Sequence, residues 1–219
     1  MSTNNKTQAA VFGASSITNI DFIKIINSSF LTVACDGGYY HFLKAKCEPD
    51  ILVGDFDTLN ENEIKNPGII YKLSPIKDDT DVFWAIKFLM GEGYKEIHLY
   101  GCLGQKLDHT LANIELLSFM KEKGVTAYLH SPDNSYVLFV IKNEEVSFNP
   151  RAVGRISVFS LNEKTTGVYE TNLKYLLNNA TLTNSVPLGV SNEFIGKQSS
   201  IKVTSGSLLI MTDYNNLNV

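Results

Sequence analysis

The sequence feature that most constrains the fold is a regular alternation of apolar runs and helix-like stretches between Ala9 and Leu129. In the apolar runs nearly every residue is hydrophobic, whereas in the stretches between them apolar residues recur every three or four positions. The apolar runs are Ala9–Gly13, Leu31–Cys35, Ile51–Val53, Ile69–Leu73, Ile97–Tyr100 and Val125–Leu129. The helix-like stretches are Ile20–Ile26, the residues after Gly38, Asp81–Met90 and the segment from Leu107 to near Gly124. Strands that alternate with helices predict an α/β domain with a mostly parallel sheet covered on both faces.

The pattern changes near Asp133, where the helical periodicity ends. Short strand-like runs follow, and Asn, Gly, Ser and Thr residues join them. These runs are Tyr136–Ile141, Arg155–Leu161, Thr181–Thr183, Ile201–Thr204 and Leu208–Met211. Runs of this length joined by turn residues predict a small antiparallel β-sandwich or barrel. We therefore expect two domains, an α/β domain over residues 1–132 and an all-β domain over residues 133–219.

The composition is that of a globular protein, with 44% hydrophobic and 19% charged residues. A formal net charge of −4 argues against a general nucleic-acid binder, because affinity for the phosphate backbone comes from clusters of Lys and Arg. No apolar run approaches the length of a membrane span, and Met1–Ala10 lacks the apolar core of a targeting segment. The three cysteines form no CxxC pair, so neither a disulfide framework nor a zinc site is indicated, and a cytoplasmic location is expected.

Acidic residues gather at two places that the predicted sheet would bring to one edge. The first group follows the apolar run Ile51–Val53, and the second stands at the start of the helix-like stretch that contains Phe83. The acids are Asp55, Asp57, Asp78, Asp79 and Asp81. Carboxylates held close together raise one another's pKa unless a cation neutralises them, and Mg²⁺ is a hard cation that prefers oxygen ligands. The pattern favours a magnesium site, with helix-capping acids and solvated loop charge as the alternative.

A glycine-containing loop, Gly101–His109, leads into the last helix of the α/β domain. On that helix the apolar residues that form one stripe are Leu107, Leu111, Ile114 and Leu117. Such a loop can present backbone N–H groups and a helix dipole to a phosphate, with Lys106 as a point charge. The sequence contains no GxxxxGK[ST] motif, which excludes the usual nucleotide-triphosphatase loop. Asp108 is preferred over the adjacent His109 as a functional residue, because it stands at the same sheet edge as the other acids.

Ordered motifs across both halves of the chain resemble the signatures of the thiamine pyrophosphokinase family. The motifs are Asp36-Gly37-Gly38, Gly54-Asp55-Phe56-Asp57-Thr58, Asp78-Asp79-Thr80-Asp81, Gly104-Gln105-Lys106-Leu107-Asp108-His109, Thr171-Asn172-Leu173-Lys174-Tyr175-Leu176-Leu177 and Ser191-Asn192-Glu193. The resemblance implies transfer of pyrophosphate from ATP to the hydroxyethyl group of thiamine, giving thiamine diphosphate and AMP. It also implies Mg²⁺, a Rossmann-like catalytic domain, a β-sandwich second domain, and a homodimer with thiamine bound between domains of different subunits.

The resemblance also assigns roles to individual positions. The residues that would face Mg²⁺ and the ATP phosphates are Asp55, Asp57, Asp78 and Asp81. The residues that would bind ATP are Asp36, Gly37, Gly38, Thr80, Gln105 and Lys106. The residues that would bind thiamine are Tyr175, Ser191 and Asn192. The catalytic candidates are Asp57, Asp81 and Asp108, and either of the last two could take the proton of the alcohol.

Some positions depart from the family pattern. Gln105-Lys106 replaces the usual Gly-Arg, so a two-pronged phosphate contact becomes a single ammonium group, and Asn172 replaces a glycine. Two other functions stay open at this point. Asp55-Phe56-Asp57-Thr58 partly resembles the nucleophile motif of haloacid-dehalogenase-type phosphatases, although Leu59 stands where that motif has Thr or Val. The chain could also be a non-catalytic thiamine- or nucleotide-binding protein.

Overall fold

The computed structural model of the chain describes residues 7–18, 22–27, 30–76, 78–104 and 106–213. The chain divides into two compact units. The first unit comprises residues 1–116 and 123–134, and the second comprises residues 117–122 and 135–219. Gln105 and Ile20, both named in the sequence predictions, lie outside the described residues.

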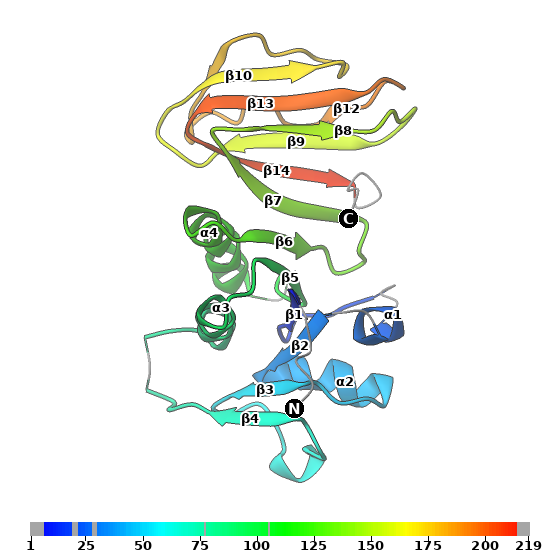
Figure 1. The fold of residues 1–219 in the computed structure, drawn as a ribbon, viewed down its shortest axis with the longest axis vertical. Coiled ribbons are helices and arrows are strands. Elements are labelled where there is room, and N and C mark those ends of the chain that lie inside the picture. Colours follow the sequence, from blue (N-terminus) through cyan, green and yellow to red (C-terminus); the bar gives the residue numbers. More distant parts are fainter. Residues whose placement is uncertain (1–6, 19–21, 28–29, 77, 105, 214–219) are drawn as a thin grey trace. The chain divides into compact units, whose positions relative to one another are not determined.

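The first unit is built on a parallel sheet. Its strands are β1 (Gln8–Phe12), β2 (Phe30–Cys35), β3 (Ile51–Gly54), β4 (Ile69–Lys72), β5 (Glu96–Tyr100) and β6 (Thr126–His130). They lie in the order β6-β5-β1-β2-β3-β4, and each recorded pair is parallel (Figure 1). The strand order reverses between β1 and β5, which is the topological switch point where doubly wound sheets bind their ligands. The predicted Rossmann-like, mostly parallel sheet is thereby confirmed.

Helices cover both faces of this sheet. They are α1 (Phe22–Asn27), α2 (Tyr39–Ala45), α3 (Asp81–Gly91) and α4 (Leu107–Glu122), with short 3₁₀ turns η1 (Asp36–Gly38) and η2 (Glu61–Glu63). Helix α3 packs against β1, β2 and β3, and α1 and α2 lie on the opposite side of the sheet in Figure 1. Within the part of the chain that the structure describes, no helix combines the length and apolar character needed to cross a membrane.

The core of the first unit is aromatic. Phe12 of β1 stacks on Tyr100 of β5 at 5.2 Å between ring centroids and meets Phe42 of α2 edge-on at 5.0 Å. Tyr39 and Leu52 complete the centre of this cluster, and both are fully buried. Each such side chain contributes about 1.5–3 kcal/mol when it leaves water. The cluster therefore anchors the ends of β1, β3 and β5, and the polar loops follow directly after these ends.

The predicted apolar stripe on α4 is wrong for its first half. Leu107 and Leu111 are 73% and 55% exposed, whereas Leu117 is buried. The buried face of the helix runs instead through Asn113, Leu117 and Met120. Periodicity locates an apolar face but does not reveal where along a helix the packing partner begins. The first turns of α4 lie at the open carboxyl edge of the sheet, where apolar side chains stay exposed.

The second unit is a β-sandwich, as predicted. One set of neighbouring strands has the order β12-β9-β14-β7, and the other has the order β11-β10-β13-β8. The strands are β7 (Tyr136–Lys142), β8 (Glu145–Phe148), β9 (Arg155–Ser160), β10 (Thr165–Thr171), β11 (Ala180–Leu182), β12 (Asn192–Glu193), β13 (Ser199–Ser205) and β14 (Ser207–Asp213). All recorded pairs within the unit are antiparallel. Strands β8, β10 and β12 were missed from the sequence.

The close approach of Gly38 to the end of β1 leads to a prediction about stability. A Cβ on Gly38 would lie 2.0 Å from the carbonyl oxygen of Phe12, so Gly38→Ala should lower the free energy of unfolding by about 1–3 kcal/mol or more. Gly91, at the end of α3, has no neighbour within 4 Å of such a Cβ. Gly91→Ala is the matched control and should be neutral or stabilising by up to about 1 kcal/mol. Urea unfolding of both variants tests this, and equal stabilities would contradict the close approach.

Candidate functional site

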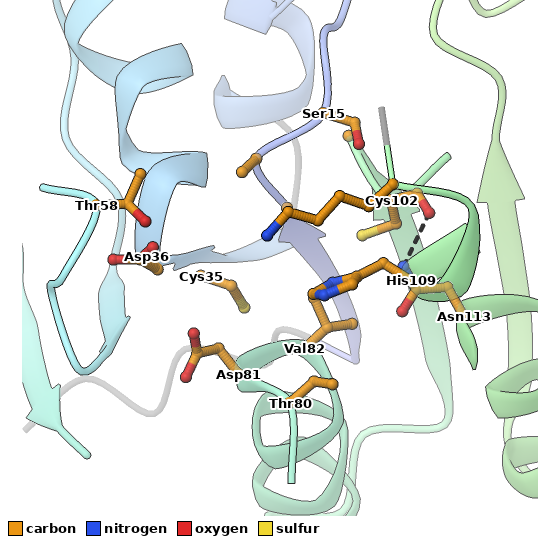
Figure 2. Close-up of a pocket in the computed structure, with 14 residues that line it drawn as sticks. Ser15, Cys35, Asp36, Thr58, Thr80, Asp81, Val82, Cys102, His109 and Asn113 are labelled. Carbon is orange, nitrogen blue, oxygen red and sulfur yellow. Dashed lines mark hydrogen bonds between the residues drawn. The ribbon is translucent and has the colours of Figure 1, made fainter. Parts of the chain in front are cut away.

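A pocket of about 240 Å³ opens at the switch point between β1 and β5. Figure 2 shows Asp36, Asp81 and His109 approaching it from η1, α3 and α4 respectively. The lining residues are Gly13, Ala14, Ser15, Cys35, Asp36, Thr58, Thr80, Asp81, Val82, Gly101, Cys102, Lys106, His109 and Asn113. Most of them follow a strand of the first unit or stand at the start of one of its helices, whereas Cys35 ends β2 and Asn113 lies in the second turn of α4. The sequence-predicted residues Asp36, Thr80, Asp81 and Lys106 are therefore brought together in one cavity.

Backbone contacts form the floor of the pocket. The N–H of Gly13 donates to the carbonyl of Tyr100 at 2.8 Å, and the N–H of Ser15 donates to the carbonyl of Gly101 at 2.9 Å. Gly101 has a φ of +60°, and a Cβ there would lie 2.4 Å from the carbonyl oxygen of Gly13. The ring nitrogen Nε2 of His41 contacts the carbonyl oxygens of Gly13 and Ser15 at 3.1 and 3.0 Å. Direct backbone hydrogen bonds thus fix the two loops to one another.

Three carboxylates meet at the adjacent ends of β2 and β3. Asp36, Asp55 and Asp57 each offer an oxygen, and these oxygens lie within 4.8 Å of one another. Phe56, between the last two, has a φ of +63° and a buried side chain in the core cluster. Burying this ring turns the flanking carboxylates outward, towards Asp36. The sequence placed Asp36 with the nucleotide and not with the metal, because the meeting of β2 and β3 is not visible in the chain order.

The cluster has the properties of a cation site. The Oδ1 atom of Asp36 is buried, and among the described residues it has no hydrogen-bond partner. A buried carboxylate oxygen without a partner is costly, and a hard cation would satisfy it. Three carboxylate oxygens at this spacing suit Mg²⁺, which prefers oxygen ligands and completes its shell with water or phosphate. The residues present therefore fit the metal.

The start of α3 supplies a different part of the pocket wall. Thr80 is the N-cap, and its hydroxyl accepts a hydrogen bond from the N–H of Phe83 at 3.1 Å. Asp81 occupies the first turn and lines the pocket, whereas Asp78 is exposed in the preceding loop. Asp79, in the loop before α3, forms an ion pair with Lys87 of that helix. Of the five predicted acids, Asp55 and Asp57 therefore belong to the three-carboxylate cluster, whereas Asp78, Asp79 and Asp81 lie outside it.

The start of α4 places the neighbours Asp108 and His109 differently. His109 lines the pocket, whereas Asp108 is not among the lining residues, and its carboxylate accepts from the N–H of His109 at 2.8 Å. Asn113, one turn further along, donates to the carbonyl of Cys102 at 2.8 Å and so ties the loop to the helix (Figure 2). The spacing of Lys106, His109 and Asn113 at three and four residues could have indicated this face from the sequence.

Two thiols also line the pocket. Neither Cys35 nor Cys102 is in a disulfide, and both are buried. Burial raises the pKa of Cys102 to about 12. The thiol therefore stays protonated at neutral pH and is not an activated nucleophile.

The residues predicted to bind thiamine lie in the second unit and differ in exposure. The Tyr175 ring is 60% exposed, and the Lys174 ammonium lies 5.5 Å from its centroid. Ser191 is exposed with a φ of +61°, and its N–H donates to the Ser157 hydroxyl at 2.9 Å. Asn192 is only 3% exposed. Tyr175 and Ser191 are thus available to a ligand, whereas the Asn192 amide is directed inside the unit.

A doubly wound parallel sheet with glycine loops and acids at its carboxyl edge is the arrangement of α/β domains that bind nucleotides and other phosphorylated ligands. Comparison with known families makes the class more specific. Residues 22–129 match the family described as thiamin pyrophosphokinase, catalytic domain. Residues 143–209 match the family described as thiamin pyrophosphokinase, vitamin B1 binding domain. The two matches follow one another along the chain and together span most of it.

Individual relatives agree with these matches. The thiamine pyrophosphokinase of Bacillus subtilis is 27% identical over 194 residues, which are 83% of this chain and 86% of the relative. Thiamin pyrophosphokinase 1 of Caenorhabditis elegans is 25% identical over 87% of this chain and 82% of its own length. The crystal structure of the Bacillus subtilis protein shares the fold, with a TM-score of 0.83 over 94% of this chain and 98% of that one, at 23% identity. The chain belongs to the thiamin pyrophosphokinase family of enzymes.

The acid cluster yields a prediction about metal binding. Asp57→Asn keeps the shape of the side chain but removes a charge from the cluster, so turnover should fall by about two orders of magnitude or more. Without Mg²⁺ the variant should be at least as stable as wild type, because repulsion among the carboxylates is relieved. Added Mg²⁺ should raise the melting temperature of wild type more than that of the variant. Glu63→Gln, in η2, is the control, and near-normal turnover in Asp57→Asn would contradict the metal site.

A second prediction concerns Glu170 in β10, which is 4% exposed. Burial raises its pKa from 4.5 to about 7, although a hydrogen bond from Asn192 opposes the shift. Because the folded protein holds this proton more tightly than the unfolded chain, the stabilising contribution is present below pH 4.5 and is lost as pH rises to about 7. Glu170→Gln does not titrate, so its stability relative to wild type should increase by about 2–3 kcal/mol across that range.

Urea unfolding of both proteins at several pH values measures this difference. His130, whose pKa burial lowers to about 3, gives the opposite slope, but it contributes equally to both proteins and cancels. A stability difference that does not change with pH would show that the Glu170 carboxyl has its ordinary pKa in the folded state.

Proposed function

We propose that the protein transfers pyrophosphate from ATP to the hydroxyl group of thiamine, forming thiamine diphosphate and AMP. The observation that carries the proposal is the pocket at the switch point, where a glycine-built floor meets a three-carboxylate cluster in a chain of this family. Phosphoryl transfer needs positioning and charge neutralisation more than covalent chemistry, and this pocket offers both. We assign ATP and Mg²⁺ binding to residues 1–132, and thiamine binding and dimerisation to residues 133–219.

The ATP phosphates would lie over the loops that follow β1, β2 and β5. Backbone N–H groups and the N-termini of α3 and α4 favour negative charge there. The side chains of Thr80 and Lys106 line this pocket, and Gln105 precedes Lys106 in the chain. Asp36, Gly37 and Gly38 form the turn after β2. Lys106 supplies a single charge in place of the family's arginine, so it attracts a phosphate without fixing its orientation.

The residues that would hold Mg²⁺ are Asp36, Asp55 and Asp57. Asp81, which lines the pocket, and Asp78, in the loop before α3, would face the metal from the side of the phosphates. When bound, the metal would neutralise charge on the phosphates during transfer. The chain's own contribution is to hold these oxygens in place, because the buried Phe56 ring and the 3₁₀ turn at Asp36 fix the two segments that carry them.

In the transfer step, the thiamine hydroxyl oxygen forms a bond to the β-phosphorus of ATP. The bond from that phosphorus to the oxygen bridging the α- and β-phosphates breaks, and AMP leaves with the bridging oxygen. The hydroxyl proton must pass to a base. Between the two candidates we favour Asp81, because it lines the pocket whereas Asp108 is not among the lining residues.

Thiamine would be held by Tyr175 and Ser191, since an aromatic face suits the thiazolium cation. We further propose that the protein is a homodimer in the cytoplasm. Exposed apolar side chains in loops of the second unit support an interface; they are Tyr175, Leu176, Val186, Leu188, Val190 and Ile195. The absence of a disulfide among its three cysteines, all of which the structure describes, accords with a reducing compartment.

A single assay tests the activity. The protein is incubated with Mg²⁺, ATP and thiamine, and AMP and thiamine diphosphate are measured by chromatography. Equal amounts of the two products, each dependent on thiamine, are expected. Release of inorganic phosphate without thiamine would instead identify a phosphatase, and binding of both ligands without turnover would identify a non-catalytic sensor.

If each active site combines the first unit of one chain with the second unit of its partner, complementation should occur. We would co-express Asp57→Asn with a Tyr175→Ala/Ser191→Ala double variant, so that dimers form at random. In a mixed dimer one site inherits both defects and the other inherits two intact halves, so roughly a quarter of wild-type activity should return. Each variant expressed alone is the control. Activity that stays at the level of the single variants would place each site within one chain.

A further inference from the structure

We propose that Glu170 is a positioning residue for thiamine, acting through the Asn192 side chain to fix the backbone that carries Tyr175. The inference rests on the proposed role of Tyr175 in binding thiamine. Neither Glu170 nor Asn192 need touch the substrate, because both are buried beneath the segment that presents the tyrosine ring.

The Asn192 amide has all its hydrogen-bonding capacity in use. Its Nδ2 donates to the Glu170 carboxylate and to the Tyr175 carbonyl, each at 2.6 Å. Its Oδ1 accepts from the N–H of Tyr175 at 3.0 Å and from the N–H of Glu193 at 2.9 Å. A primary amide has two donors and two acceptor positions, so no capacity is left for a ligand. The partners also determine the orientation of the amide, because two N–H groups face its oxygen and two acceptors face its nitrogen.

The amide takes the place of a strand residue opposite Tyr175. Leu173 pairs with Phe194 as an isolated bridge, and the N–H of Lys174 donates to the carbonyl of Glu193 at 3.0 Å. At Tyr175 this pairing continues through the Asn192 side chain, which bonds both the N–H and the carbonyl. Tyr175 is therefore held at its backbone, while its ring stays exposed.

Glu170 keeps the amide in that position. It supplies the acceptor for the second Nδ2 hydrogen, and its own N–H donates to the carbonyl of Leu177 at 3.0 Å, closing the loop that contains Tyr175. Its Oε1 would lie 3.8 Å from a Cβ on Gly189, so it also sits under the segment that leads to Ser191. Without this carboxylate, a buried N–H of Asn192 loses its partner, and rotating to find another would release Tyr175.

An exposed ion pair spans the same two segments but is a weaker constraint. The Lys174 ammonium lies 2.8 Å from the Glu193 carboxylate, with both side chains nearly half exposed. Exposed pairs of this kind are screened by water and salt. The buried Glu170–Asn192 contact is the one that can hold the loop.

The test compares Glu170→Leu, which removes the acceptor, with Glu170→Gln, which keeps an oxygen at the same place. Glu170→Leu should raise the KM for thiamine by about fivefold to tenfold and leave the KM for ATP within about twofold. Glu170→Gln should restore most of the loss. Exchange of the Tyr175 amide hydrogen should accelerate in Glu170→Leu. Glu163→Leu, at an exposed turn, is the matched control, and Glu170→Val replaces Glu170→Leu should the latter not fold.

A double-mutant cycle separates positioning from a general loss of stability. If Glu170 acts through the tyrosine, Glu170→Leu should add little to the thiamine KM of Tyr175→Ala. Effects that multiply, or an unchanged thiamine KM in Glu170→Leu, would overturn the inference while leaving the thiamine site in place. A Tyr175→Ala variant with normal thiamine KM would instead remove Tyr175 from the proposed site, and the inference would fail with it.

Discussion

The structure depends on the close approach of two backbone loops, one after β1 and one after β5. Gly13 and Gly101 meet so closely that a side chain on either would collide with the carbonyl oxygen of the other. The hydrogen bond from the Gly13 N–H to the Tyr100 carbonyl continues the parallel pairing of the two strands into these loops. The pocket floor is therefore made of peptide groups, whose geometry is set by the sheet. Groups of this kind suit phosphates, which need N–H donors at short range.

Next to this floor, three carboxylates gather in a cluster that destabilises the local structure in the absence of a cation. Gathering Asp36, Asp55 and Asp57 costs free energy in the absence of a cation, because their charges repel one another. The opposing contribution comes from the core immediately below, where Phe56 and Leu59 pack with Phe12 and Tyr39. The same short turn thus carries both the buried ring that fixes it and two of the three acids in the proposed metal site.

Much of this arrangement was accessible from the sequence. Strands such as Ile51–Gly54 are buried on both faces, so they stand out as continuous apolar runs, and the acids after them follow from chain order. Strand β10 was missed because Gly167, at a φ of +64°, breaks its alternation where the register shifts, and because it buries Thr165 and Glu170. The sequence could not show that His109, and not Asp108, lines the pocket, because neighbouring helical residues point about 100° apart and only the packing decides which one faces the cavity. The hydrogen bond from the Asn192 side chain to Glu170 could not be predicted either, because the two residues are 22 positions apart in the sequence.

The two pocket thiols have a practical consequence. Cys35 and Cys102 face the cavity but are almost fully covered, so an alkylating reagent can reach them only when the surrounding loops open. The rate of their modification therefore reports the free energy of that local opening, without any engineered label. Mass spectrometry would resolve each thiol, and Cys47, which lies outside the pocket lining, provides an internal reference. The native cysteines thus make the transient opening of this pocket measurable in the unmodified protein.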